Sequence, residues 1–273
     1  MVKFCWHGVA SYSLNIDGVE LSVDPFFADD QGFNFWFKEN QHKPSFEQYF
    51  QLVNPEFIVI THGHFDHCCL HTLRVITEKK SVQLIAGRKV LAALHTFDAV
   101  HPQTKMIEAK LNEDIRLGSL NLRSLKAIHW QQGIWGNFIS AQYANNRHWG
   151  PPPVIAGGTP LSYLLSNEDK KIYLSGDNKL PAIPNFKVDL AFINIGTYLF
   201  HPFFGVPVEP LITLKEVPQV IERLKCRIVV LLHYDWDNFL KPLLPEEIED
   251  YLTKVVADCR IVVPKPNCWL ELD

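Results

Sequence analysis

The stretch that decides the fold is Phe57-Ile58-Val59-Ile60-Thr61-His62-Gly63-His64-Phe65-Asp66-His67. Its first four residues form an apolar run, which is typical of a buried strand. His62 and His64 follow at alternate positions, so both imidazoles can face the same way and bind one ion. Asp66 and His67 come next, at the start of a predicted helix that Asp66 is suited to cap. The sequence therefore predicts a metal site at a strand-to-helix turn.

The four candidate ligands of this stretch lie within six residues, from His62 to His67. So short a segment cannot comfortably bring all four to one ion. Two neighbouring ions, about 3.5–4 Å apart in two-metal sites, are the more natural arrangement. The alternative is a surface loop that happens to be rich in histidine, since twelve histidines are scattered along the chain. The order His-x-His-x-Asp-His at a strand end favours the metal site.

Short strands and helices alternate on both sides of this stretch, and Asp17-Gly18 is a strong hairpin turn signal. Residues 26–50 form an aromatic-rich insertion without a clear period. The pattern indicates an α/β chain with no flexible linker between its halves. The predicted strands are 2–6, 11–16, 20–23, 57–60, 82–86, 119–128, 161–165, 171–174, 188–195, 227–232, 260–263 and 268–272, and the predicted helices are 70–79, 88–97, 213–225 and 245–259.

The histidine stretch resembles the His-x-His-x-Asp-His signature of the metallo-β-lactamase superfamily, whose metals lie at one edge of two sheets. Four further elements of that family have counterparts here in the same order, each after a predicted strand: Asp24, His129, Asp177 and His233. The resemblance implies a metallo-β-lactamase-like αββα four-layer sandwich, in which two mixed β-sheets are flanked by helices. It also implies a single hydrolase domain over residues 1–273.

The same resemblance implies how the ligands are divided between two ions. One ion would be held by His62, His64 and His129, the other by Asp66, His67 and His233, with Asp177 bridging them. Such ligands suit Zn²⁺, and Mn²⁺ or Fe²⁺ where oxygen ligands contribute. Asp24 would orient the histidine loop through hydrogen bonds.

Several of these ligands have an alternative interpretation. His148 lies in the same long loop as His129 and competes with it for the third histidine position. Asp177 would otherwise be a turn residue in Gly-Asp-Asn, and His233 a hydrogen-bonded core histidine. Asp24 would otherwise only end a strand before Pro25. The positions at strand ends, in the family's order, favour the ligand interpretation.

The implied reaction is hydrolysis of an ester-like bond in a lactone, ester or phosphodiester by a metal-activated hydroxide, with Asp66 and Asp177 as catalytic residues that orient the water. The chain is more similar to the branch containing L-ascorbate phosphate lactonase and N-acylphosphatidylethanolamine phospholipase D than to true β-lactamases. That branch often opens Gly-His-Ala-Ser, whereas Val9 stands here in place of the histidine. The alternatives are a nucleotide or nucleic-acid phosphodiesterase, and a non-catalytic metal-binding module of the same fold.

Composition limits the partners and the compartment. The net charge of −4 argues against a general nucleic-acid surface, and a small-molecule substrate is expected. The N-terminus lacks a signal-peptide pattern, and the apolar runs are too short to span a bilayer, so we expect a cytoplasmic protein. The six cysteines contain no Cys-x-x-Cys pair, and we expect them to be free thiols. Aromatic loops around 26–50, 130–149 and 198–204 would either line a pocket or bury in a homo-oligomer. His201 is a candidate substrate contact, and Asp235 and Asp237 are candidate supports for His233.

Overall fold

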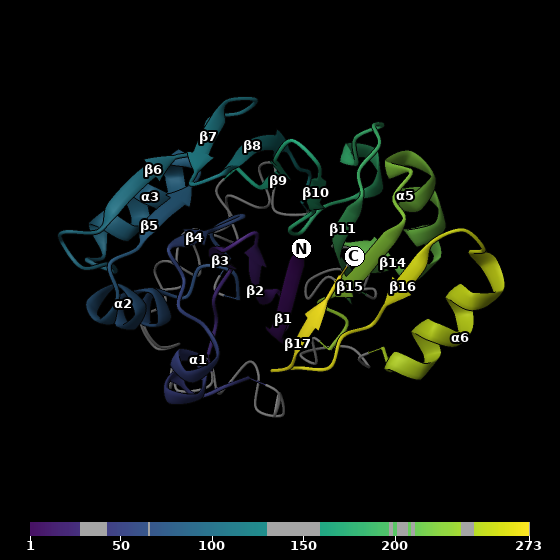
Figure 1. Ribbon diagram of the computed structural model, residues 1–273, viewed down its shortest axis with the longest axis horizontal. Coiled ribbons are helices and arrows are strands. Elements are labelled where there is room, and N and C mark those ends of the chain that lie inside the picture. Colours follow the sequence, from purple (N-terminus) through teal and green to yellow (C-terminus); the bar gives the residue numbers. More distant parts are fainter. Residues whose placement is uncertain are drawn as a thin grey trace.

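The computed structural model describes residues 1–27, 43–64, 66–129, 159–196, 199–200, 207–208, 211–235 and 243–272. Two large mixed β-sheets lie between two groups of helices (Figure 1). In sheet order, the first sheet consists of β17 (Trp269–Glu271), β1 (Val2–Gly8), β2 (Ser11–Ile16), β3 (Val19–Val23), β4 (Phe57–Val59), β5 (Gln83–Ala86) and β6 (Lys105–Glu108).

The second sheet has the same layout in the other half of the chain. In sheet order its strands are β16 (Arg260–Val262), β15 (Ile228–Leu232), β11 (Leu190–Gly196), β10 (Lys171–Leu174), β9 (Leu161–Ser166), β8 (Leu120–Lys126) and β7 (Asp114–Leu117), with β14 (Ile212–Thr213) paired to β11. A separate short pair is formed by β12 (Leu199–Phe200) and β13 (Pro207–Val208).

The helices cover the outer faces of the two sheets. In Figure 1, α1 (Phe46–Leu52), α2 (Leu70–Lys79) and α3 (Arg88–Thr96) lie on the side of β4 and β5, and α5 (Val217–Leu224) and α6 (Pro245–Val255) on the side of β15 and β16. Two short 3-10 turns, Leu180–Ala182 and Leu214–Glu216, complete the described helical segments. Among the described residues, none of the helices has the length and apolar character needed to cross a membrane.

The two sheets share one apolar core. The ring of Phe192 on β11 stacks on Tyr12 of β2 with centroids 5.2 Å apart, and its centroid lies 5.0 Å from that of Phe4 on β1. A second core joins the outer face of the first sheet to its helices, where Ile58 and Leu84 pack with buried residues such as Leu73. This layering confirms the predicted αββα sandwich.

Strand direction explains why the candidate ligands meet. β3, β4, β5 and β6 are parallel, as are β10, β11, β15 and β16, and β8 runs in the same direction as β10 because both are antiparallel to β9. Carboxyl ends of parallel strands lie at one edge of a sheet, where α/β proteins place their sites. Asp24, His129, Asp177 and His233 each follow a strand that ends at such an edge.

Two expectations about the first half need correction. The insertion contains the helix α1, which begins with a capping box: the Ser45 side chain accepts from the Gln48 backbone, and the Gln48 side chain accepts from the Ser45 backbone. Asp66 does not cap the next helix. The backbone N–H groups of His67 and Cys68 bond back to the His64 carbonyl, and this tight turn delays the helix start to Leu70. Cys69 is the capping residue instead.

Candidate metal centre

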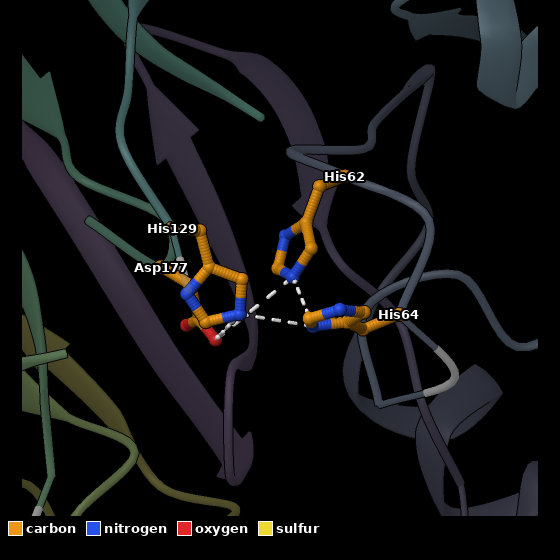
Figure 2. A group of neighbouring side chains, drawn as sticks. All are labelled: His62, His64, His129 and Asp177. Atoms are coloured by element: carbon orange, nitrogen blue, oxygen red, sulfur yellow. Dashed lines mark hydrogen bonds and ion pairs between the residues drawn. The ribbon is translucent and has the colours of Figure 1, made fainter. Parts of the chain in front are cut away.

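Two groups of side chains meet at the edge where the strands end. The ligating atoms of each group lie within 4.8 Å of one another. Figure 2 shows the four side chains of the first group pointing toward one another: His62 and His64 come from one loop, and His129 and Asp177 from two other segments of the chain. The first group is His62, His64, His129 and Asp177, and the second is Asp66, His67 and His233.

The first group brings three imidazole nitrogens to one point. His62 Nε2 lies 2.8 Å from His64 Nδ1, and His129 Nε2 lies 3.1 Å from the same atom. An imidazole nitrogen offers either one proton or one lone pair, so His64 Nδ1 cannot form a full hydrogen bond with both. A cation at the point of convergence would satisfy all three nitrogens. The structure places His129 in this group, and His148 lies outside the described residues.

The second group combines two imidazoles with a carboxylate. His233 Nε2 lies 3.3 Å from Asp66 Oδ2, and His67 Nε2 lies 3.6 Å from the same oxygen. All three side chains are at least nine-tenths buried. Mixed nitrogen and oxygen ligands of this kind suit Zn²⁺, and also Mn²⁺ or Fe²⁺.

Asp177 lies between the two groups. Its Oδ1 is 3.3 Å from His67 Nε2 and 3.9 Å from His233 Nε2, while its Oδ2 is 3.6 Å from His129 Nε2 and 3.9 Å from His62 Nε2. Each carboxylate oxygen therefore faces one group. A carboxylate in this position can bridge two ions, with one oxygen directed to each.

Asp24 and Thr61 set the tautomers of two histidines. The Asp24 carboxylate accepts from the Thr61 backbone N–H at 2.7 Å, from the Thr61 hydroxyl at 2.6 Å and from His67 Nδ1 at 2.7 Å. Since the Thr61 hydroxyl donates to Asp24, its oxygen accepts from His62 Nδ1 at 3.0 Å. Both imidazoles therefore carry their proton on Nδ1 and turn the lone pair of Nε2 toward the cluster.

The lone pair of His67 tests whether a cation fits. His67 Nε2 is buried and has no well-formed hydrogen bond, yet it lies 3.3 Å from Asp177 and 3.6 Å from Asp66. A lone pair that faces two carboxylates is repelled by both unless positive charge lies between them. The residues present therefore fit a divalent cation at this position.

Burial and charge shape the pKa values of the cluster. Burial lowers the pKa of His62 well below its usual value, so this imidazole is neutral and able to act as a ligand. Burial also opposes charge on His67, but the carboxylates of Asp177, Asp66 and Asp24 outweigh it and raise the pKa of His67. A proton or a cation must supply positive charge at the same place.

The carboxylates show the same demand for positive charge. Burial raises the pKa of Asp66, but the neighbouring histidines prevail and lower it to about 2. The pKa of Asp177 is also held well below its usual range, because His67 and His233 outweigh its burial. Both groups are anionic at neutral pH.

Sequence reasoning missed three polar residues that support this centre. Asn194 Nδ2 donates to Asp177 Oδ1 at 3.0 Å, and Asn178 Oδ1 accepts from the backbone of Ile128, one residue before His129. Thr61 joins Asp24 to His62. The available signal was a lone polar residue, Asn194, inside the apolar run Ala191–Ile195. The candidate substrate contact His201 and the candidate support Asp237 lie outside the described residues.

Comparison with known proteins finds a family profile and relatives that match most of this chain. The family profile described as the beta-lactamase superfamily domain matches residues 21–234. A UPF0173 metal-dependent hydrolase of Methanopyrus kandleri is 22% identical over 275 residues, an alignment that covers 97% of this chain and 98% of the relative.

Two solved structures share the fold over nearly the whole chain. Igni18, a metallo hydrolase from Ignicoccus hospitalis, has a TM-score of 0.68 at 18% identity and covers 100% of this chain and 99% of its own. An isothiocyanate hydrolase from Delia radicum gut bacteria has a TM-score of 0.68 at 16% identity, with 98% of each chain covered.

Proposed function

The chain belongs to the metallo-β-lactamase superfamily and is a metal-dependent hydrolase, and on this premise we propose that two cations act together at its histidine-rich edge. Zn²⁺ is the first candidate, with Mn²⁺ or Fe²⁺ as alternatives. His62, His64 and His129 would hold one cation, Asp66, His67 and His233 the other, and Asp177 would bridge them. The observation that carries the proposal is the position of Asp177, with one oxygen toward each group.

The proposed reaction is hydrolysis of an ester-like bond in a small molecule: a lactone, an ester or a phosphodiester. When bound, two dications lower the pKa of a coordinated water and polarise a carbonyl or phosphoryl oxygen. Asp66 and Asp177 are anionic at neutral pH, so they accept hydrogen bonds from the attacking water and fix its orientation. Asp24 stays outside the reaction and fixes the tautomer of His67.

The first part of the test is stoichiometry. Elemental analysis of the purified protein, after loading with Zn²⁺, Mn²⁺ or Fe²⁺ in turn, should give a metal-to-chain ratio near two. A ratio near one would require the ligands to be reassigned. No bound metal would overturn the proposal.

The second part is turnover of a substrate panel by the loaded protein. The panel contains lactones, carboxylic esters, phosphodiesters and thioesters, and an isothiocyanate because a neighbour of the same fold is an isothiocyanate hydrolase. We expect Asp177→Ala to reduce turnover about 10²-fold or more, as when one charge-stabilising group is lost. The matched control is Asp189→Ala, which removes a carboxylate at the start of β11, away from the site. Absence of hydrolysis by the wild type, Asp177→Ala and Asp189→Ala alike would favour a non-catalytic metal-binding module.

A further inference from the structure

The turn between β1 and β2 is tied to the end of β15 through Val9. The Val9 backbone N–H donates to both carboxylate oxygens of Asp235, at 3.1 and 3.2 Å. The Val9 carbonyl accepts from the backbone N–H of His233 at 3.1 Å and from Trp6 Nε1 at 2.9 Å. We call this arrangement of Trp6, Val9, His233 and Asp235 the Val9 clasp. It links the first sheet to the second at the site.

The backbone of the clasp is strained at two places. Val9 has a φ of 47° and His233 a φ of 67°, both in the left-handed region. A β-branched residue such as valine is a genuine outlier there. Such conformations persist only where the surroundings impose them, and they cluster at functional sites. In the clasp, the hydrogen bonds to both backbone groups of Val9 supply that constraint.

The strain has a consequence for the second group of the metal centre. The left-handed backbone of His233 turns the chain at the end of β15, and the side chain of the same residue lies 3.3 Å from Asp66. Asp235 stands two residues later and holds Val9, which in turn holds the His233 backbone. Through these contacts the carboxylate of Asp235 is connected to the backbone of His233 by way of Val9.

We propose that Asp235 is a positioning residue for the cation held by Asp66, His67 and His233. Its hydrogen bonds with the Val9 backbone fix the backbone that carries the His233 side chain. This inference rests on the proposed function, in which His233 is a ligand. It predicts an effect on one cation only. The first group, with His62, His64 and His129, has no part in the clasp.

The experiment measures the two cation affinities separately. Zn²⁺ and the spectroscopic probe Co²⁺ are titrated into the metal-free wild-type protein, Asp235→Ala and the near-isosteric Asp235→Asn, in competition with a chelator. Loss of a group that orients a metal ligand typically costs 10–100-fold in affinity. We expect Asp235→Ala to weaken by that factor the binding of the cation held by Asp66, His67 and His233, and to leave the affinity for the other cation unchanged. Asp235→Asn keeps one acceptor oxygen, so it should lose less of that affinity.

The matched control is Asp189→Ala. Asp189 also accepts a backbone N–H, that of Lys171 at 2.9 Å, but at the opposite ends of the strands. It should bind both equivalents as the wild type does. Circular dichroism of each variant checks folding, and if Asp235→Ala fails to fold, the Asp235→Asn titration decides.

The possible outcomes distinguish a failure of the role given to Asp235 from a failure of the proposed two-cation function. A folded Asp235 variant that binds both equivalents with wild-type affinity overturns the role of Asp235 and leaves the proposed function standing. An equal loss of both equivalents also contradicts it, because a general structural role would weaken the whole site. A wild-type protein that binds neither equivalent overturns the proposed function and the inference together.

Discussion

Gly176, the residue before Asp177, occupies a place that only glycine can take. Its φ is 52°, and a Cβ there would lie 2.8 Å from both Cβ and Cγ2 of Thr61. Thr61 cannot move away, because its hydroxyl bonds to Asp24 and His62. We therefore expect Gly176→Ala to lower the free energy of unfolding by more than about 1 kcal/mol and to weaken metal binding. Denaturant unfolding and metal titration of the variant measure the two effects.

The control for this variant is Gly18→Ala. Gly18 has a φ of 89° but nothing lies within 4 Å of its added Cβ, so it tests backbone strain without the clash. It should cost stability and leave metal binding unchanged. Equal metal affinity in Gly176→Ala and the wild type would show that the contact with Thr61 does not matter for the centre.

His7 makes stability depend on pH. It is fully buried, its Nε2 lies 2.9 Å from Ser13 Oγ, and burial lowers its pKa from 6.5 to about 4. Between these values the unfolded chain binds more protons than the folded one, so stability is lost as pH falls from 6.5 toward 4. Linkage puts the loss near 2 kcal/mol at pH 5. Unfolding at pH 7.5 and 5.0 should show that extra loss in the wild type but not in His7→Gln; identical losses would refute it.

The sequence located most of the candidate ligands because their chemistry is concentrated at strand ends. The spacing of His62, His64 and His67 indicated a metal site directly, whereas Asp177 and His233 were identified through the family resemblance, each after a predicted strand. The supporting residues are harder to find. Asn194 contacts Asp177 across two neighbouring strands, and Asp235 contacts the backbone of Val9. Both contacts join residues that are far apart in the sequence, so the local sequence pattern does not indicate them.

At the scale of elements, helix α5 ends with a conformation that its residue does not favour. Its capping residue Lys225 has a φ of 48°, where glycine is the usual choice. We expect Lys225→Gly to raise the free energy of unfolding by about 0.5–1 kcal/mol, because the relief of left-handed strain exceeds the added entropy of the unfolded chain. Denaturant unfolding measures the change.

Helix α2 provides the comparison. It also ends at a lysine, but Lys80 has an extended φ of −135°. Glycine there relieves no strain, so Lys80→Gly should lower stability by about 0.5–1 kcal/mol. Changes of the same sign in the two variants would contradict the account of the helix ends.

Element bounds were predicted unevenly: the predicted helices 213–225 and 245–259 are shorter in the structure, at Val217–Leu224 and Pro245–Val255, while other elements match closely. Helix Leu70–Lys79 and strand Lys171–Leu174 match their predicted bounds. Helix α1 lies in an aromatic segment whose only clear signal was the capping box at Ser45. Strands β6 and β7 are edge strands of four residues each, and the alternation in so short a run is weak evidence.

At the scale of the whole molecule, the site depends on how two sheets are brought together. Donors from the first sheet, such as His62, meet donors from the second, such as His233, only because the core around Phe192 packs the sheets face to face. Composition and periodicity predicted a mixed α/β chain but not this alignment of two sheets. The family resemblance supplied it, since it orders the donors along the chain before any contact between them is known.

The most direct test of the central claim is X-ray diffraction from crystals of the loaded protein at the absorption edge of the bound metal. The account predicts two anomalous peaks about 3.5–4 Å apart. One should lie among His62, His64 and His129, the other among Asp66, His67 and His233, with Asp177 between them. A single peak, or peaks away from these side chains, would contradict it.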